Sequence, residues 1–242
     1  MGSLHMQGTA GEERKGQLSR EAVEEALTLR HGRTVQEKLK AGKVAVAGLG
    51  GLGSNVAFSL ARIGVGSLHL IDFDRVDVTN LNRQQYRMCH VGRYKTEALK
   101  EELLEINPYL EIRTDCVRMT EENLGELFRE DEIICEAFDD PECKAILVNG
   151  VLETFPEKVV VSASGMAGYG RSNEIRTRKV TEHFYLCGDE VSDSQEEPGL
   201  MAPRVAICAG HEANLIAELL IRRRDNDGGQ TDIKEEMRRN QK

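Results

Sequence analysis

The sequence lacks the features of membrane, secreted and nucleic-acid-binding proteins. No run of apolar residues is long enough to cross a bilayer, and the first residues show no basic-then-apolar signal pattern. The net charge is -9 at pH 7, without a basic stripe that could neutralise a nucleic-acid backbone. The six cysteines have no short paired spacing, which favours reduced thiols over a disulfide framework. We therefore expect a cytoplasmic protein that binds neither nucleic acid nor a membrane.

The length limits the number of domains. A chain of 242 residues with 40% hydrophobic residues can bury one substantial core but has little room for two full-sized domains. The opening residues 1–6 resemble a cloning remnant and are excluded from the fold. The expected division is 1–42 (tag remnant and N-terminal helices), 43–165 (core), 166–224 (C-terminal extension with a mobile loop and a final helix) and 225–242 (polar tail).

The core alternates between strand and helix patterns. A β-branched run at 43–47 leads into a glycine loop, a helical pattern follows, and a second apolar strand at 67–72 completes a βαβ unit. Further strands are expected at 111–117, 132–137 and 159–163, and helices at 95–106, 121–129 and 142–152. This order predicts an α/β fold with a doubly wound, Rossmann-like, mostly parallel sheet.

The pattern changes after residue 165. Residues 172–178 and 182–186 alternate like exposed strands, which predicts a C-terminal antiparallel extension. Residues 187–204 are rich in Asp, Glu, Ser, Gly and Pro and are expected to be mobile. A final helix is expected to open at Pro203.

The glycine loop has the spacing of a phosphate-binding turn. Gly48 permits the tight turn, Gly50 lets the backbone approach a phosphate, and Gly53 lets helix and strand pack closely, with Gly51 in the same loop. Asp72 ends the next strand, where its carboxylate can accept hydrogen bonds from ribose hydroxyls. A purely structural turn is the alternative, and the strand, loop, helix and acid together favour nucleotide binding.

The segment 72–84 distinguishes ATP from a dinucleotide. Hydride transfer needs a dry nicotinamide pocket, whereas this segment supplies acids, amides and an arginine where a triphosphate and metal would lie. ATP is therefore favoured, and an oxidoreductase of the same fold is the disfavoured alternative.

These residues closely resemble the ThiF/MoeB/HesA family, the activating enzymes for sulfur-carrier and ubiquitin-like proteins. The resemblance covers about residues 43–165 and is nearest to the short ThiF-like proteins of thiamine biosynthesis. It is carried by the glycine loop, Asp72-Phe73-Asp74, Asn80-Leu81-Asn82-Arg83-Gln84, Val91-Gly92 with Lys95, Ile106-Asn107-Pro108 and Phe138-Asp139-Asp140. It implies a homodimer that uses ATP and Mg²⁺ to adenylylate the C-terminal glycine carboxylate of a small ubiquitin-like sulfur carrier protein ending in Gly-Gly, releasing pyrophosphate.

The resemblance assigns the catalytic charges. Arg83 and Lys95 would neutralise the triphosphate and the departing pyrophosphate, and Asp139 would bind Mg²⁺. Each could instead be an ordinary surface charge, but their place in the motif favours the functional roles. Because Asp precedes Pro141, we expect Asp140 to cap the following helix and Asp139 to bind the metal.

The resemblance also assigns the nucleotide-binding residues. Asp72 would bind the ribose, and Asp74 belongs to the same site. Asn80 and Gln84 would orient phosphate oxygens or the loop itself, although Asn80 could serve only a turn.

An arginine near the N-terminus resembles a residue that acts across a dimer. In Arg30-His31-Gly32-Arg33, the second arginine corresponds to one that reaches into the partner subunit's nucleotide site in the family. The connector from Arg33 to the glycine loop is shorter here than in better-known members, so a plain surface arginine is the alternative.

The chain departs from the family at its cysteines. Many relatives hold a structural zinc with two Cys-x-x-Cys pairs, and this sequence contains none, so no structural zinc is expected. Cys187 could carry a thioester or a persulfide, but the acids around it disfavour a thiolate. We interpret it as a small buried hydrophobic residue.

Three other functions share the fold. The site could activate a carboxylate on tRNA or on a small molecule, although the acidic charge disfavours RNA. The chain could be an oxidoreductase, or the non-catalytic half of a heterodimer, which retention of Arg83, Lys95 and Asp139 disfavours.

Overall fold

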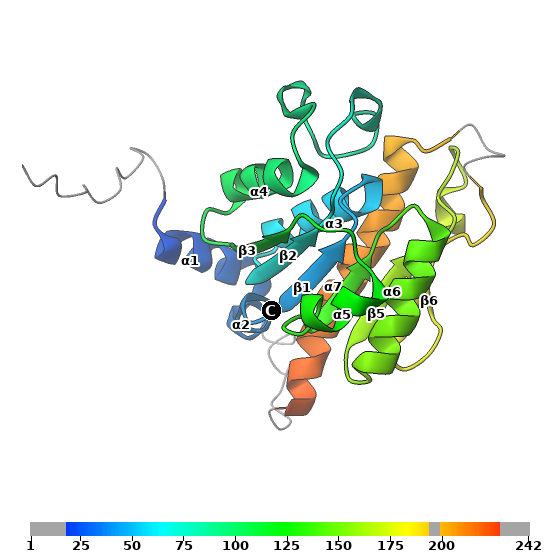
Figure 1. Cartoon of the computed structure of the whole chain (residues 1–242). Coiled ribbons are helices and arrows are strands. Elements are labelled where there is room, and N and C mark those ends of the chain that lie inside the picture. The colour runs from blue at the N-terminus through cyan, green and yellow to red at the C-terminus, as the bar shows by residue number, and fades with distance from the viewer. Residues whose placement is uncertain (1–17, 194–198, 228–242) are drawn as a thin grey trace, which may run out of the picture.

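The structure, a computed structural model, describes residues 18–193 and 199–227. These residues form one seven-stranded sheet with helices on both faces, in the strand order β3-β2-β1-β4-β5-β7-β6 (Figure 1). The strands are β1 (Lys43–Ala47), β2 (Ser67–Ile71), β3 (Glu111–Asp115), β4 (Ile133–Glu136), β5 (Val159–Ala163), β6 (Arg176–Lys179) and β7 (Phe184–Gly188). The helices are α1 (Arg20–His31), α2 (Arg33–Lys40), α3 (Gly51–Arg62), α4 (Lys95–Ile106), α5 (Glu121–Leu127), α6 (Pro141–Thr154) and α7 (Ala202–Asp227). The predicted Rossmann-like fold class is confirmed.

The strand order sets the position of a ligand site. All the neighbouring strands pair in parallel except β6 and β7, which are antiparallel. In the sheet, β2 and β3 lie on one side of β1, and the later strands β4, β5 and β7 lie on its other side. Open α/β sheets bind ligands at the carboxyl ends of the strands where the order reverses in this way. The reversal between β1 and β4 therefore marks the expected location.

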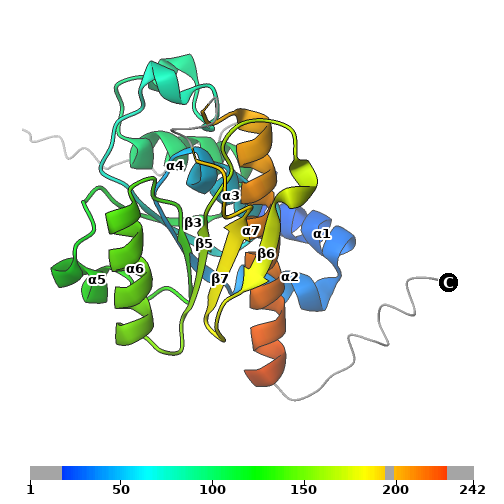
Figure 2. The ribbon, with the colours of Figure 1, turned by 90° about the vertical axis from the view of Figure 1, so that its right-hand side faces the viewer.

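Two apolar layers cover the two faces of the sheet. Val44 and Val46 of β1 pack toward the side of α3, α4 and α7, while Ala45 and Ala47 pack toward α5 and α6. Figure 2 shows α5 and α6 on one face and α3 and α7 on the other. Burial on both faces explains why the central strands read as continuous apolar runs. At about 25 cal/mol per Å² of apolar surface, this burial is the main stabilising term.

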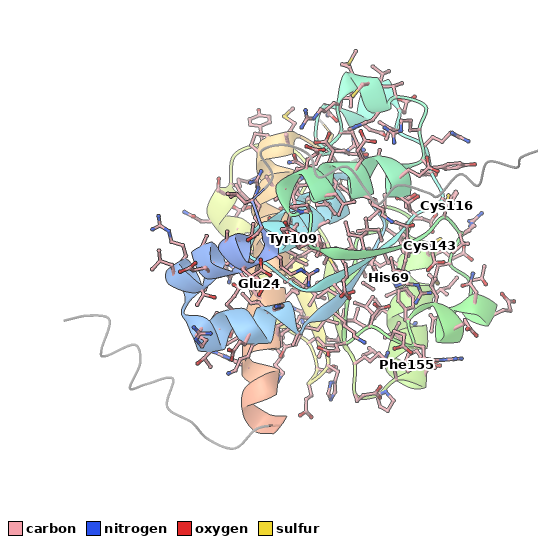
Figure 3. All side chains as sticks on the ribbon, turned by 90° about the vertical axis from the view of Figure 1, so that its left-hand side faces the viewer. Glu24, His69, Tyr109, Cys116, Cys143 and Phe155 are labelled. Carbon is pink, nitrogen blue, oxygen red and sulfur yellow. The ribbon has the colours of Figure 1, made fainter. Side chains whose placement is uncertain are left out.

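The N-terminal helices are attached beside the start of the sheet. Tyr109 donates its hydroxyl to the carbonyl of Leu18 at 2.6 Å, and the guanidinium of Arg20 lies 5.4 Å from the centre of the same ring. Glu24 of α1 pairs with Lys40 of α2 at 2.6 Å. Figure 3 shows Tyr109 and Glu24 on the side of the molecule where these two helices lie. The helices therefore cover the amino-terminal ends of the strands, leaving the carboxyl ends clear of them.

The C-terminal extension differs from the sequence expectation at two points. Residues Ser172–Glu174 form a 3₁₀ turn, so only β6 is an exposed edge strand in this part. β7 lies inside the sheet beside β5, and Cys187 within it is fully buried. The alternating pattern of β7 predicts an exposed strand because the local sequence does not show its packing against α7. That helix comes from a distant segment of the chain and packs against β7.

The stretch 187–204 is also better ordered than expected where the structure describes it. Asp189 accepts hydrogen bonds from the backbone amides of Val191 and Ser192 and pairs with buried Arg204. These contacts give an acidic, glycine-containing loop a defined conformation. The remaining residues of this stretch, 194–198, lie outside the described residues.

The last helix starts one residue before the expected position and continues to Asp227, so it includes the first three residues of the predicted polar tail. The rest of that tail and the suspected cloning remnant lie outside the described residues. Among the residues that the structure describes, no helix is both long and apolar enough to cross a membrane.

Candidate functional site

A cavity of about 860 Å³ lies where the strand order reverses. It opens at the carboxyl ends of β1, β2, β4 and β5, and most of the predicted site residues line it. These are Gly48, Gly50, Gly51, Asp72, Asp74, Asn80, Arg83, Gln84, Lys95 and Asp139. Gly53 and Arg33 do not line it. The structure therefore brings residues from five separate segments into one cavity.

The glycine loop has the geometry of an anion-binding turn. Gly48 has a φ of 90°, and a Cβ there would lie 2.7 Å from the carbonyl oxygen of Ala137. A Cβ on Gly53 would lie 1.9 Å from the Gly48 carbonyl oxygen, so Gly53 serves the close packing of helix on strand. Gly50 is different, because a Cβ there would meet only a Gln84 side-chain nitrogen, at 3.7 Å. Helix α3 starts at the next residue, so its N-terminal amides can receive a phosphate.

Asp72 connects the glycine loop to the end of β2. Its Oδ2 accepts a hydrogen bond from the amide of Leu49 at 2.7 Å, and Oδ1 accepts one from the amide of Asp74 at 2.8 Å. Burial raises the pKa of this carboxyl, and the nearby charge of Lys95 acts in the opposite direction. The carboxylate is therefore held at the cavity wall by backbone donors and a cation.

Lys95 brings a nearly buried positive charge to the same wall. Its Nζ lies 2.8 Å from Asp74 Oδ2 and 3.8 Å from Asp72 Oδ2. The side chain is 8% exposed, so its charge acts in an environment where solvent screening is weak. The pair of acids fixes the ammonium group beside the glycine loop.

The loop after β2 carries polar atoms without partners. Buried Nε of Arg83 and buried Oε1 of Gln84 make no hydrogen bond within the described residues. Arg83 Nη1 donates to Asn82 Oδ1 at 2.9 Å, which holds the guanidinium at the cavity. Buried polar groups are normally paired, so unpaired atoms in a cavity wall indicate a polar ligand.

Asn80 has a structural role in this loop. Its Oδ1 accepts a hydrogen bond from the amide of Asp77 at 3.1 Å, and Asp77 caps the short 3₁₀ turn Val78–Asn80. The turn role that the sequence left open for Asn80 is therefore present, and the residue also lines the cavity.

The structure shows the capping role expected for the second of the two acids after β4, and the metal-binding role of the first stays a prediction. Asp140 caps α6 by accepting a hydrogen bond from the amide of Cys143 at 2.8 Å, with Pro141 at the first helical position. Asp139 is exposed at the cavity and belongs to none of the ion pairs of the described residues. One free carboxylate beside a phosphate site fits Mg²⁺, which takes most of its other ligands from phosphates and water. The described residues contain no cluster of three or more metal-ligating side chains.

Lys144 is a cavity residue that the sequence analysis missed. It lies on α6, and its Nζ contacts Oε2 of Glu136, a fully buried carboxylate at the end of β4. Glu136 also accepts hydrogen bonds from Ser162 Oγ at 2.5 Å and from the amide of Phe138 at 2.8 Å. A charged residue that closes the apolar strand Ile133–Glu136 was the available signal, because a buried carboxylate requires a cation. Arg75 and Arg118 also line the cavity.

Arg33 and Cys187 do not line the cavity of their own chain. Arg33 is exposed at the start of α2, and that helix ends beside the amino-terminal ends of β1 and β2. Cys187 is fully buried in β7, and burial raises the pKa of its thiol to about 12. A thiol in this state is a poor nucleophile, and the interpretation of Cys187 as a small buried hydrophobic residue is confirmed.

Comparisons with known proteins agree with this geometry. The ThiF family matches residues 23–241. The adenylyltransferase and sulfurtransferase UBA4 of Candida glabrata is 32% identical over 179 residues, which cover 71% of this chain and 41% of that protein. The molybdopterin-synthase adenylyltransferase of Haemophilus influenzae is 40% identical over 110 residues, 45% of each chain. The chain thus aligns with less than half the length of these curated relatives.

Solved structures share the fold. The tRNA N6-threonylcarbamoyladenosine dehydratase TcdA of E. coli, in complex with ATP, superposes with a TM-score of 0.77 at 20% identity, covering 86% of this chain and 97% of that one. MccB of E. coli superposes with a TM-score of 0.63 at 25% identity, covering 78% and 59%. With the family match extending over most of the sequence, this chain belongs to the ThiF family.

Proposed function

We propose that this protein uses ATP to adenylylate the C-terminal glycine carboxylate of a small ubiquitin-like sulfur carrier protein, releasing pyrophosphate. The observation that carries the proposal is the meeting of the glycine loop, Asp72, Arg83, Lys95 and Asp139 in one cavity. The relatives named as adenylyltransferases at 32% and 40% identity support the same chemistry.

The reaction joins a carboxylate oxygen to the α-phosphorus and breaks the bond to the pyrophosphate oxygen. Arg83 and Lys95 lie on the side of the glycine loop, where they neutralise the charge that grows on the departing pyrophosphate. Asp139 would hold Mg²⁺, which would supply positive charge to neutralise the phosphates. Asp72 orients the ribose. The protein thus contributes mainly positioning and fixed charge, and needs no covalent intermediate of its own.

The other side of the cavity is lined partly by small residues, which supports the binding of an extended peptide tail there. Ser164, Gly165 and Ala167 line it with small side chains, on either side of the larger Met166. An extended tail ending in Gly-Gly fits such a wall because it places a free carboxylate at the α-phosphate without side-chain obstruction. The sequence resemblance to short ThiF-like proteins supports a carrier of thiamine biosynthesis as the substrate.

We also propose a homodimer in which Arg33 of one copy serves the cavity of the other. Exposed Arg33 does not line the cavity of its own chain, which supports an action in trans. Mixing an Arg33→Ala chain with an Asp139→Ala chain should then restore exchange activity through one intact site per hybrid dimer. Verified hybrids without activity would remove this role from Arg33.

The test is pyrophosphate exchange into ATP with candidate carrier proteins. Exchange should appear with one carrier ending in Gly-Gly and disappear when its last two glycines are removed. Magnesium chelation should also stop it. Exchange that persists with the truncated carrier, or that requires a tRNA or a small carboxylic acid instead, would contradict the proposal.

A further inference from the structure

Three segments of the C-terminal half meet at one buried arginine. Arg204 lies in the first turn of α7, and its side chain is 2% exposed. Its Nη2 forms an ion pair with the carboxylate of Asp189, which is equally buried. Its Nη1 donates to the carbonyl oxygens of Gly170 at 2.6 Å and Arg171 at 3.0 Å. The planar fork of arginine is suited to such simultaneous contacts.

The other carboxylate oxygen of Asp189 connects the ion pair to the backbone of a neighbouring loop. Its Oδ1 accepts hydrogen bonds from the amides of Val191 at 3.0 Å and Ser192 at 2.8 Å. The hydroxyl of Ser192 in turn accepts a hydrogen bond from the amide of Ala167 at 3.0 Å. A Cβ on Gly165 would lie 2.1 Å from Asp189 Oδ1, so the two loops pack without space for a side chain. Arg204 and Asp189 therefore fix both loops relative to α7.

The backbone beside this pair is strained. Within the described residues, Arg171 and Glu190 are the two non-glycine residues with positive φ, at 45° and 61°. Arg204 donates to the carbonyl of the first, and Asp189 immediately precedes the second. Such conformations are unfavourable for residues with a Cβ and persist only where surrounding contacts enforce them. The buried pair is placed to enforce both.

The two loops form one wall of the cavity. This acceptor wall comprises residues 164–167 and 190–192, and all of them line the cavity. The glycine loop and Asp72 set the position of the nucleotide on the side of β1 and β2. An attacking carboxylate must approach the α-phosphorus opposite the departing pyrophosphate, which leaves the acceptor wall as its route.

We propose that Arg204, through its pair with Asp189, is a positioning residue that holds the acceptor wall in the conformation that receives the carrier tail. The inference rests on the proposed function. Loss of a merely stabilising ion pair would lower the resistance to unfolding and leave the use of both substrates, ATP and the carrier, unchanged. A positioning role instead weakens use of the carrier while ATP binding is preserved.

The test uses Arg204→Lys, which keeps the charge but loses the fork. Kinetics of pyrophosphate exchange should show a carrier KM raised by about tenfold or more, with an ATP KM within about twofold of the original. Ser192→Ala removes one link between the loops with little risk to folding, and should raise the carrier KM by about threefold.

Lys158→Gln is the matched control. Lys158 is also nearly buried and donates to three loop carbonyls, those of Phe128, Arg129 and Asp131, but it does not line the cavity. Its variant should lower thermal stability and leave both KM values unchanged. If Ser192→Ala and folded Arg204→Lys keep the original carrier KM, or if their ATP KM rises in parallel, the positioning role is wrong while the proposed function stands. Absence of carrier-dependent exchange in the unmodified protein would overturn the proposed function itself.

Discussion

The two walls of the cavity are built in different ways. The nucleotide wall follows short motifs near the ends of neighbouring parallel strands, and it consists of Gly48, Gly50, Gly51, Asp72, Asn80, Arg83, Gln84, Lys95 and Asp139. The acceptor wall consists of irregular loops fixed by buried charges from other elements, chiefly Arg204 with Asp189. Local sequence therefore specifies one wall, and long-range pairing specifies the other.

The two walls also differ in whether their charged and polar groups are already paired within the described residues. On the nucleotide wall, Arg83 Nε and Gln84 Oε1 lack partners among the described residues and Asp139 is exposed, so polar groups remain available for a ligand. Arg204 behind the acceptor wall and Lys144 in the cavity lining already neutralise buried carboxylates. The first set is available for chemistry and the second maintains shape.

The largest expected effect is on the nucleotide wall. Arg83→Ala and Asp139→Ala should each lower pyrophosphate exchange by about 100-fold or more, because both remove charge stabilisation at the phosphates. Circular dichroism should show a retained fold. The adjacent Asp140→Ala provides the contrast, since losing a helix cap costs about 1 kcal/mol of stability but removes no phosphate contact. Near-normal exchange in either of the first two variants would show that its role is misassigned.

An intermediate effect is expected from Glu212, which lies on α7 behind the acceptor half of the sheet. It is fully buried, its Oε2 has no partner within the described residues, and Cys135 Sγ lies 3.9 Å from its Oε1. Burial raises the pKa of this carboxyl to about 8, with Lys144 opposing the shift and Glu136 adding to it. The ordinary pKa is 4.5, so the folded protein retains a proton that the unfolded chain releases between these values. Stability contributed by this group therefore falls as pH rises through that window.

Glu212→Gln should remove this pH dependence. The variant should gain stability relative to the original protein as pH rises from 5 to 8, by about 1.4 kcal/mol for each pH unit in this window, since one pKa unit corresponds to about 1.4 kcal/mol. Urea unfolding at several pH values measures the difference. Glu218→Gln, on the same helix but partly exposed and paired with Arg222, should show no such trend. A Glu212→Gln variant that becomes relatively less stable toward pH 8 would contradict the assignment.

The smallest effect is expected at Cys187. Cys187→Ser should leave carrier-dependent exchange unchanged, because the thiol is buried in β7 and its pKa is raised to about 12. In the folded protein, a thiol reagent should modify exposed Cys89 and Cys116 before Cys187. A large loss of exchange in a folded Cys187→Ser protein would mean that the thiol acts in the first step.

The contrast between the walls also explains what the sequence could predict. The position of Asp72 was predictable because it directly follows β2, and that of Lys95 because it belongs to a short motif at the start of α4. The burial of β7 within the sheet was not predictable, because it depends on packing by α7, which comes from a distant segment. Arg204 gave no local signal, since its partners Asp189 and Gly170 lie 15 and 34 residues away. Arg33 does not line the cavity of its own chain, so the role proposed for it requires a second copy that one chain cannot show.

The most direct test of adenylylation follows two labels in ATP. With a carrier ending in Gly-Gly, a label on the α-phosphorus should become attached to the carrier, and a label on the γ-phosphorus should leave entirely as pyrophosphate. The attached label should be released by hydroxylamine, as expected for an acyl-adenylate. Transfer of the γ-label to the carrier, or attachment of the α-label to a carrier without its terminal glycines, would contradict the account.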